Sequence, residues 1–171
     1  MISLERGENM NYFISDLHFF HEALLGQNDF APRLFKTVDE MNAQLIDSWN
    51  AIVKEQDTVY HLGDLAMHPQ YEKGSQEILE QVKQLNGEIH FIKGNHDSRA
   101  FFRYLEKNDP GMMNQDKKFY FHDVGAIVKF NHHQYYLTHY PLLLGQNDAV
   151  RNLHGHIHNY SVPIGNDVNV G

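Results

Sequence analysis

Short apolar runs alternate with amphipathic stretches along the N-terminal half of the chain. The runs are rich in aromatic and β-branched residues and have the length of buried strands. In the longest amphipathic stretch, apolar side chains recur at intervals of three and four residues, which places them on one face of a helix. The predicted strands cover residues 10–15, 58–62 and 89–92, and the predicted helices cover residues 38–54, 75–85 and 98–107.

Capping and breaking residues mark the ends of these predicted helices. Thr37 is a candidate N-cap, and Glu40 three residues later completes a capping box. The pair Asn86-Gly87 is typical of a helix end, and Asp109-Pro110-Gly111 breaks the third helix. The alternation of strands and helices predicts an α/β arrangement.

The C-terminal half has a different pattern, in which short strand-like segments follow one another without helices between them. Asn131 and His132 occupy the expected hairpin turn between two of these segments. We expect one layered α/β domain over residues 1–171, with residues 1–9 as a loosely ordered leader. The predicted strands of this half are residues 118–122, 126–130, 133–138, 153–155 and 167–170.

The composition agrees with a single globular domain. A chain of 171 residues is long enough to bury about 70% of its unfolded surface. Hydrophobic residues make up 42% and charged residues 21%, which excludes a disordered chain. No stretch approaches about 18 consecutive apolar residues, so we predict no membrane span. The first nine residues have no apolar segment of the kind found in secretory signals, and we expect a cytoplasmic protein.

Charge and cysteine content exclude several function classes. The net charge of −8 argues against an extended nucleic-acid surface, because such surfaces neutralise phosphates with lysine and arginine. The absence of cysteine excludes disulfides, thiolate zinc sites, iron–sulfur clusters and cysteine nucleophiles. The 13 histidines are the unusual feature of the composition.

Polar clusters follow each predicted strand of the N-terminal half. Because functional sites of α/β sheets lie at the carboxyl ends of the strands, these clusters are expected at one edge. The C-terminal half adds further histidines directly after its apolar segments. The clusters are Asp16-Leu17-His18, Gly63-Asp64, Gly94-Asn95-His96-Asp97, His139 and Gly155-His156-Ile157-His158.

This set of side chains suits a pair of metal ions. Asp16 and His18 are two residues apart, so both can point to the same side and hold one ion, and His156 and His158 can do the same. Asp64 has two carboxylate oxygens and can bridge two ions. Mixed nitrogen and oxygen ligands suit manganese, iron, zinc or nickel rather than calcium or magnesium. We therefore predict two divalent ions, with manganese favoured.

The order of these motifs resembles that of the calcineurin-like metallophosphoesterases, over residues 16–158. The segments 38–42 and 60–64 are similar to a small prokaryotic or phage branch of that family. The resemblance implies an α/β fold with two packed mixed β-sheets flanked by helices, in a four-layer α/β/β/α sandwich. It also implies that His96 is the general acid that protonates the leaving oxygen. The implied ligands are Asp16, His18, Asp64 and His158 for one ion, and Asp64, Asn95, His139 and His156 for the other.

The expected function is that of a binuclear metal-dependent phosphohydrolase. A hydroxide bridging the two ions would attack phosphorus, and a small phosphodiester is favoured because His96 suits a leaving group that needs a proton. Arg33 and His21 are candidates for contacting the substrate. Asp97 either orients a neighbouring imidazole or caps the following helix, and the cap is favoured.

Two other readings are weighed against this one. The first is a non-catalytic interaction scaffold with the same fold, which would be expected to lose ligands or the acid, whereas both are complete here. The second is another binuclear hydrolase, such as an amidohydrolase or a metallo-β-lactamase. Their histidine motifs differ from the early Asp16-Leu17-His18 and late Gly155-His156-Ile157-His158 of this chain.

Overall fold

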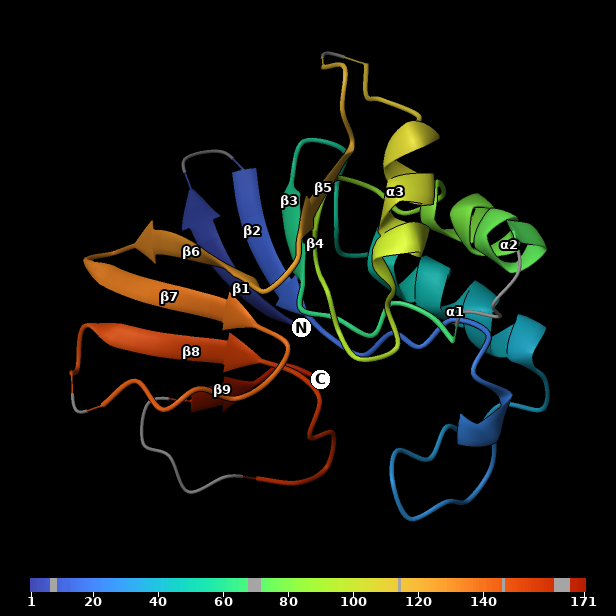
Figure 1. Cartoon of the computed structure of the whole chain (residues 1–171), viewed down its shortest axis with the longest axis horizontal. Coiled ribbons are helices and arrows are strands. Elements are labelled where there is room, and N and C mark those ends of the chain that lie inside the picture. Colours follow the sequence, from blue (N-terminus) through green and yellow to red (C-terminus); the bar gives the residue numbers. More distant parts are fainter. Residues whose placement is uncertain (7–8, 68–71, 114, 146, 162–166) are drawn as a thin grey trace.

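A computed structural model of the chain describes residues 1–6, 9–67, 72–113, 115–145, 147–161 and 167–171. These residues form two β-sheets, three α-helices and one short 3-10 helix at Glu22–Leu24 (Figure 1). The strands are β1 (Ile2–Arg6), β2 (Asn9–Ile14), β3 (Thr58–His61), β4 (Glu88–Ile92), β5 (Phe119–His122), β6 (Gly125–Phe130), β7 (His133–Thr138), β8 (Val150–His154) and β9 (Asp167–Asn169). The helices are η1 (Glu22–Leu24), α1 (Val38–Asn50), α2 (Glu72–Val82) and α3 (Arg99–Lys107).

The first sheet has the strand order β1-β2-β3-β4-β5. Strands β2 to β5 run parallel, and β1 pairs antiparallel with β2. Each predicted strand of the N-terminal half is therefore confirmed, and their carboxyl ends lie along one edge of this sheet. That edge carries the polar clusters that follow β2, β3 and β4.

The second sheet has the order β6-β7-β8-β9. Strands β6 and β7 form an antiparallel hairpin, whereas β7, β8 and β9 are parallel. Asn131 and His132 form the turn of the hairpin with φ angles of 48° and 65°. Two consecutive positive φ angles are typical of a type I′ turn, so the predicted hairpin is confirmed. The carboxyl ends of β7 and β8 point toward the polar edge of the first sheet (Figure 1).

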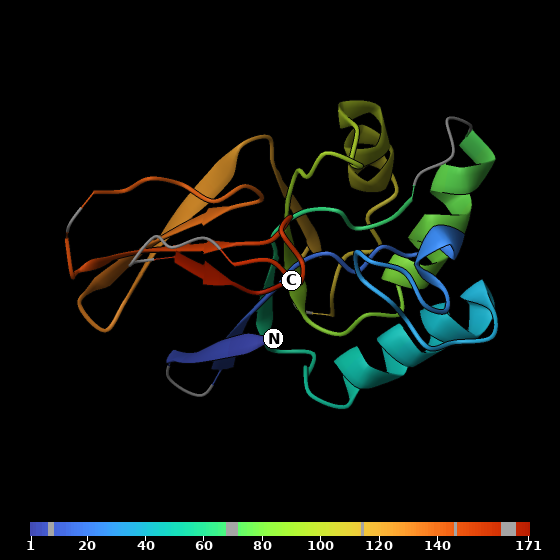
Figure 2. The ribbon, with the colours of Figure 1, turned by 90° about the horizontal axis from the view of Figure 1, so that it is seen from below.

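Two hydrophobic cores hold these layers together. One lies between the first sheet and the three α-helices and includes the buried side chains of Trp49, Val82 and Phe101. The other lies between the two sheets and includes Phe13 and Leu137. Figure 2 shows the resulting order of second sheet, first sheet and helices. None of the helices in the described part of the chain is long and apolar enough to span a membrane.

The N-cap of α1 agrees with the sequence prediction. The Thr37 hydroxyl accepts a hydrogen bond from the Glu40 amide at 3.1 Å, which satisfies one of the free N–H groups of the first turn. The Glu40 carboxylate accepts from the Lys36 amide at 2.9 Å rather than from Thr37. The cap is thus confirmed, with its return bond one residue earlier than in the standard capping box.

Two expectations about the architecture need correction. Residues 1–9 were expected to be a loosely ordered leader, but Ile2–Arg6 form β1, while residues 7–8 lie outside the described part. Ile2 and Leu4 pack against the core between the sheets, which gives this segment a reason to order. The α/β class with two mixed sheets is confirmed, but all three α-helices lie on the first sheet. The described residues therefore form three layers, because no α-helix among them covers the far side of the second sheet (Figure 2).

Candidate metal centre

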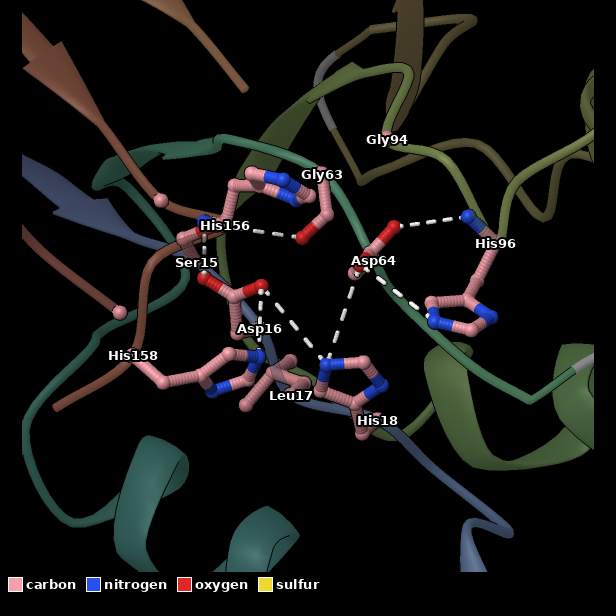
Figure 3. A network of polar contacts seen from close by, with 12 residues as sticks. Ser15, Asp16, Leu17, His18, Gly63, Asp64, Gly94, His96, His156 and His158 are labelled. Carbon is pink, nitrogen blue, oxygen red and sulfur yellow. Dashed lines mark hydrogen bonds and ion pairs between the residues drawn. The ribbon is translucent and has the colours of Figure 1, made fainter. Parts of the chain in front are cut away.

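Five chain segments meet where the two sheets join, and each brings one of the polar clusters. The segment after β2 runs beside the segment after β3, with the Asp16 amide donating to the Gly63 carbonyl at 3.0 Å and the His18 amide donating to the Asp64 carbonyl at 3.0 Å. The His156 amide donates to Asp16 Oδ2 at 3.0 Å, which joins the second sheet to the first (Figure 3). The predicted convergence of side chains from distant strand ends is thus observed.

The backbone is left-handed at five of the candidate ligands. Such a conformation costs about 1–3 kcal/mol for a residue other than glycine, and it persists only where the surroundings impose it. Strained residues of this kind cluster at functional sites, because they aim side chains that a regular strand would turn away. The residues and their φ angles are Asp16 (57°), His18 (51°), Asp64 (57°), His156 (70°) and His158 (46°).

The first cluster consists of Asp16, His18 and His158. Asp16 Oδ1 lies 3.7 Å from the Nε2 atoms of both His18 and His158. Asp16 Oδ1 and His18 Nε2 are buried and have no hydrogen-bond partner among the described residues. Buried polar atoms are normally paired, so two unpaired atoms that face one another fit a cation placed between them.

The second cluster consists of Asp64, His139 and His156. His139 Nδ1 donates to the Leu62 carbonyl at 2.9 Å, because a carbonyl can only accept, and this bond leaves Nε2 to bind a proton or an ion. That Nε2 atom lies 2.9 Å from Asn95 Oδ1 and 3.4 Å from Asp64 Oδ2. A proton on Nε2 satisfies these contacts in the protein without an ion, and with Nε2 unprotonated the same three atoms form a mixed nitrogen and oxygen donor set for a divalent ion.

Asp64 lies between the two clusters. Its Oδ2 atom is 3.9 Å from His18 Nε2 and 3.4 Å from His139 Nε2, so one oxygen faces a histidine of each cluster. Its other oxygen accepts a hydrogen bond from the His96 amide at 2.9 Å. The carboxylate is therefore fixed by one oxygen while the second faces both candidate ion positions. This arrangement suits the predicted bridge.

The imidazole of His96 also lies at this centre. Its Nε2 atom is 3.9 Å from Asp64 Oδ2, and it forms a third group with His18 and Asp64. The His96 side chain is 33% exposed, whereas those of His18 and His139 are 1% exposed. His96 thus differs from the buried histidines in having access to solvent and to an incoming substrate.

Local electrostatics favours the ionised carboxylates. Burial alone would raise the pKa of Asp64, but the hydrogen bond and charge of His139 outweigh it and lower the pKa to about 2. Burial likewise opposes ionisation of Asp16, yet its contacts with His18 and Ser15 bring its pKa below the usual value. For His139, burial lowers the pKa and Asp64 raises it, with a net rise. Both carboxylates are therefore ready to act as anionic ligands.

Gly63 makes a close approach possible at this centre. It has a φ of 98°, and a Cβ atom at this position would lie 2.5 Å from His139 Nδ1. A side chain there would push His139 away from Asp64 and Asn95, so glycine is required both by the backbone conformation and by the space.

Asp97 does not act as the helix cap that the sequence favoured. Ser98 is the N-cap of α3, because its hydroxyl accepts from the Phe101 amide at 3.1 Å. The buried Asp97 carboxylate instead accepts from the amides of Asp64 and Gly94 at 2.9 Å each, and from Leu65 at 3.1 Å. Asp97 therefore ties the segment after β3 to the segment after β4. The preference for a cap was wrong, because the serine next to it takes that position.

Arg33 and His21, predicted to contact substrate, both lie against the segment after β2. Arg33 donates from its two terminal nitrogens to the carbonyls of Leu17 and Asp16. His21 Nδ1 lies 3.2 Å from His18 Nδ1, and its ring centroid lies 5.8 Å from that of His96. Burial and the neighbouring His18 lower the pKa of His21 to about 4. The structure thus places both residues beside the predicted ligands.

Comparisons with known proteins agree with this geometry. The profile of the calcineurin-like phosphoesterase superfamily domain matches residues 11–169. An uncharacterized protein of Methanocaldococcus jannaschii is 40% identical over 136 residues, which cover 77% of this chain and 74% of that protein. The Gene 66 protein of Mycobacterium phage L5 is 34% identical over 86 residues, which cover 50% of this chain and 39% of the phage protein.

A solved structure supports the fold independently. The crystal structure of a protein of unknown function from Aquifex aeolicus aligns with a TM-score of 0.66 and 23% identity, covering 95% of this chain and 90% of that one. This likeness concerns the fold, while the profile match spans every cluster of the candidate centre. By this match, the chain belongs to the calcineurin-like phosphoesterase superfamily.

Proposed function

We propose that the protein is a binuclear metal-dependent phosphohydrolase that cleaves a small phosphodiester. The observation that carries the proposal is the position of Asp64, whose Oδ2 atom faces histidine ring nitrogens of two neighbouring clusters. Two divalent ions bound there would activate a water for attack on phosphorus and offset the charge that develops on the phosphoryl oxygens. The mixed nitrogen and oxygen donors favour manganese, with iron, zinc and nickel as the other candidates.

The clusters support an assignment of ligands to the two proposed ions. We assign Asp16, His18, Asp64 and His158 to one ion. We assign Asp64, Asn95, His139 and His156 to the other, since Asn95 Oδ1 joins that group through its 2.9 Å contact with His139. Hydrogen bonds behind the ligands fix their orientation, as the bond from His139 Nδ1 to the Leu62 carbonyl does.

His96 is proposed to give its proton to the leaving oxygen. Its backbone amide is held by Asp64, so the ring stays at the edge of the centre while one third of the side chain remains open to solvent. The alkoxide or nucleoside leaving group of a phosphodiester needs such a proton, whereas a nitrophenolate leaves well without it. The position of His96 therefore supports a phosphodiester as substrate.

The surroundings of the centre support a small organic substrate. A cavity of about 240 Å³ adjoins the first cluster and is lined by Asp16, Arg33 and His158 among others. The ring of Phe30 lies 4.2 Å from that of His158 and is 43% exposed, and the ring of Tyr140 lies 4.5 Å from that of His156 and is 49% exposed. These aromatic faces can contact the ester groups on either side of phosphorus.

A larger cavity lies elsewhere and is not proposed as the active site. It has a volume of about 510 Å³ and lies at the β6–β7 turn, where His132 and His133 are among its lining residues. Its lining contains no carboxylate, and it touches none of the three clusters. The smaller cavity is preferred because it adjoins the assigned ligands.

The test combines metal content with turnover. The protein is freed of metal with a chelator and loaded with Mn²⁺, and bound manganese is measured together with hydrolysis of bis(4-nitrophenyl) phosphate and 4-nitrophenyl phosphate. We expect two equivalents of manganese and faster hydrolysis of the diester. One equivalent under metal excess would overturn the binuclear site. Two equivalents without hydrolysis of any ester would favour a non-catalytic scaffold.

The role of His96 is tested with two diesters that differ in leaving group. His96→Ala is expected to keep two manganese ions, to lose about 10²–10⁴ in rate on a nucleoside alkyl diester, and to lose less on a nitrophenyl diester. His132→Ala, at the exposed hairpin turn, is the matched control and should retain both rates. Equal losses on the two diesters, or loss of manganese, would make His96 a ligand rather than the acid.

A further inference from the structure

We infer that Arg33 is a positioning residue that holds the Asp16–His18 segment in shape for one of the two ions, and that it does not bind the phosphoryl group. The inference rests on the proposed metal centre and assigns to Arg33 a role that differs from the contact with substrate suggested by its sequence position. It concerns the first cluster, Asp16, His18 and His158, and leaves the second cluster untouched.

The guanidinium group of Arg33 is occupied by two backbone carbonyls. One terminal nitrogen donates to the Leu17 carbonyl at 2.5 Å and the other donates to the Asp16 carbonyl at 2.6 Å. These are the two nitrogens that arginine uses to bind phosphate in a forked geometry. In this orientation the end of the fork faces the protein, so this forked pair of N–H groups is not available to a substrate.

The carbonyls that Arg33 binds lie in a strained stretch. Asp16 and His18 both have left-handed φ angles, 57° and 51°, and Leu17 between them has its side chain buried. This conformation turns the side chains of Asp16 and His18 toward one another, with Asp16 Oδ1 3.7 Å from His18 Nε2. Without donors for the Asp16 and Leu17 carbonyls, the strained conformation loses a principal source of stabilisation.

Arg33 itself is held by its own loop and by the helix behind it. Its amide donates to the Leu24 carbonyl and its carbonyl accepts from the Gly26 amide, both at 2.8 Å. The Asn28 side chain closes the loop between them by accepting from the amides of Phe30 and Ala31. The guanidinium also lies 3.9 Å from the sulfur of Met41, which is fully buried on α1. The two terminal nitrogens of Arg33 are therefore held in place beside the strained stretch.

The consequence is selective for one ion. Asp16 and His18 belong to the first cluster, whereas among the described residues no hydrogen bond joins the Arg33 side chain to Asp64, His139 or His156. Loss of an outer hydrogen-bond partner typically weakens metal binding about 10–100-fold. A change at Arg33 should therefore weaken one manganese equivalent by about that factor and leave the other near its original affinity.

The first experiment compares Arg33→Lys with wild type by calorimetric titration of Mn²⁺ into metal-free protein. Lysine keeps the positive charge but cannot donate to both carbonyls in a fork. Arg103→Lys, a change at an exposed arginine of α3, is the matched control. We expect one of two equivalents to weaken in Arg33→Lys only. Unchanged titration with a higher KM for the diester would show that Arg33 binds substrate and would overturn the inference.

The second experiment does not depend on metal. Hydrogen exchange of the backbone amides at residues 15–20 is measured by mass spectrometry in metal-free protein, and Arg33→Lys should exchange faster there than wild type while residues 94–98 keep their rates. If wild type fails to bind two ions, the proposed function fails, yet this readout still tests Arg33. Unchanged exchange at residues 15–20 would overturn the inference. If Arg33→Lys does not fold by circular dichroism, Arg33→Gln, which retains one donor group, is compared by the same two measurements.

Discussion

Asn152 should be among the most sensitive positions outside the metal ligands, because it joins β7, β8 and the loop that follows His139. It is fully buried. Its Oδ1 atom accepts from the Leu142 amide at 2.8 Å, and its Nδ2 atom donates to the Tyr136 carbonyl at 2.8 Å and to the Thr138 hydroxyl at 2.9 Å. Asn152→Ala removes these bonds, together with a 3.2 Å bond from Nδ2 to the Leu153 carbonyl, and leaves buried or partly buried partners without this side chain.

The expected cost follows from these contacts. A neutral hydrogen bond contributes about 1 kcal/mol, and an abandoned buried partner costs about 1–3 kcal/mol, so the free energy of unfolding should fall by about 3 kcal/mol or more. The loop that carries His139 loses its anchor at Leu142, so the affinity for the manganese ion proposed for the second cluster should fall as well.

The assay is urea unfolding of the metal-free protein, since bound ions would add stability by mass action. Asn108→Ala, which removes one exposed hydrogen bond to the Tyr104 carbonyl, is the matched control and should cost less than about 1 kcal/mol. A loss below about 1 kcal/mol for Asn152→Ala, with an unchanged dependence on urea, would refute the reasoning.

Three further predictions follow from the same geometry. Asp64→Asn should weaken the binding of both manganese ions by more than the factor of about 10–100 that is typical of losing an outer hydrogen-bond partner. It should also abolish turnover, and near wild-type turnover would refute the bridge. Gly155→Ala should cost about 1–3 kcal/mol in urea unfolding and weaken the first ion, because the added Cβ overlaps Ser15 Oγ and Asp16 Oδ2; an unchanged midpoint would contradict that overlap. The double variant His132→Ala, His133→Ala should keep both metal content and turnover, since its histidines lie at the hairpin turn away from the clusters, and loss of metal would show that the site is assigned to the wrong histidines.

The sequence was a good guide where the determinant is local. The spacing of Ile46 and Trp49 predicts the buried face of α1, and both side chains are buried in the core between the first sheet and the helices; Val53, part of the same pattern, is buried there just beyond the end of α1. Thr37 and the Asn131 turn are likewise decided by backbone chemistry within a few residues. These features depend on interactions between residues that are close in sequence, so tertiary contacts have little influence on them.

β1 illustrates a local signal that was overlooked. Ile2 and Leu4 alternate with polar residues, which is the period of a half-buried strand. The segment orders because β1 pairs with β2 and lays these two side chains on the core between the sheets. Its partner strand β2 follows directly in the chain, but the sheet that covers Ile2 and Leu4 comes from the C-terminal half, so the alternation alone was weak.

The residues that support the centre could not be assigned from sequence, because their partners are far away in the chain. The Asp97 carboxylate binds amides 32 and 33 residues earlier, and Arg33 binds carbonyls 16 and 17 residues earlier. Both residue types have common roles, a helix cap for aspartate and a phosphate contact for arginine; the cap was favoured for Asp97, and the phosphate contact was a candidate role for Arg33. Only the three-dimensional arrangement distinguishes a side chain that binds substrate from one that shapes the backbone.

Backbone anchors of this kind explain how the strained ligand segments can persist in the folded chain. Arg33 binds the carbonyl of Asp16, Asp97 binds the amide of Asp64, and the Asn169 side chain donates to the His158 carbonyl at 2.7 Å. Each left-handed residue costs about 1–3 kcal/mol, and each anchor is a hydrogen bond that offsets part of this cost. The free energy that offsets this strain therefore comes from folding rather than from metal binding. A centre whose candidate ligands are already in position needs little rearrangement when an ion binds. Such preorganisation would allow a few buried carboxylates and imidazoles to hold two divalent cations beside one another.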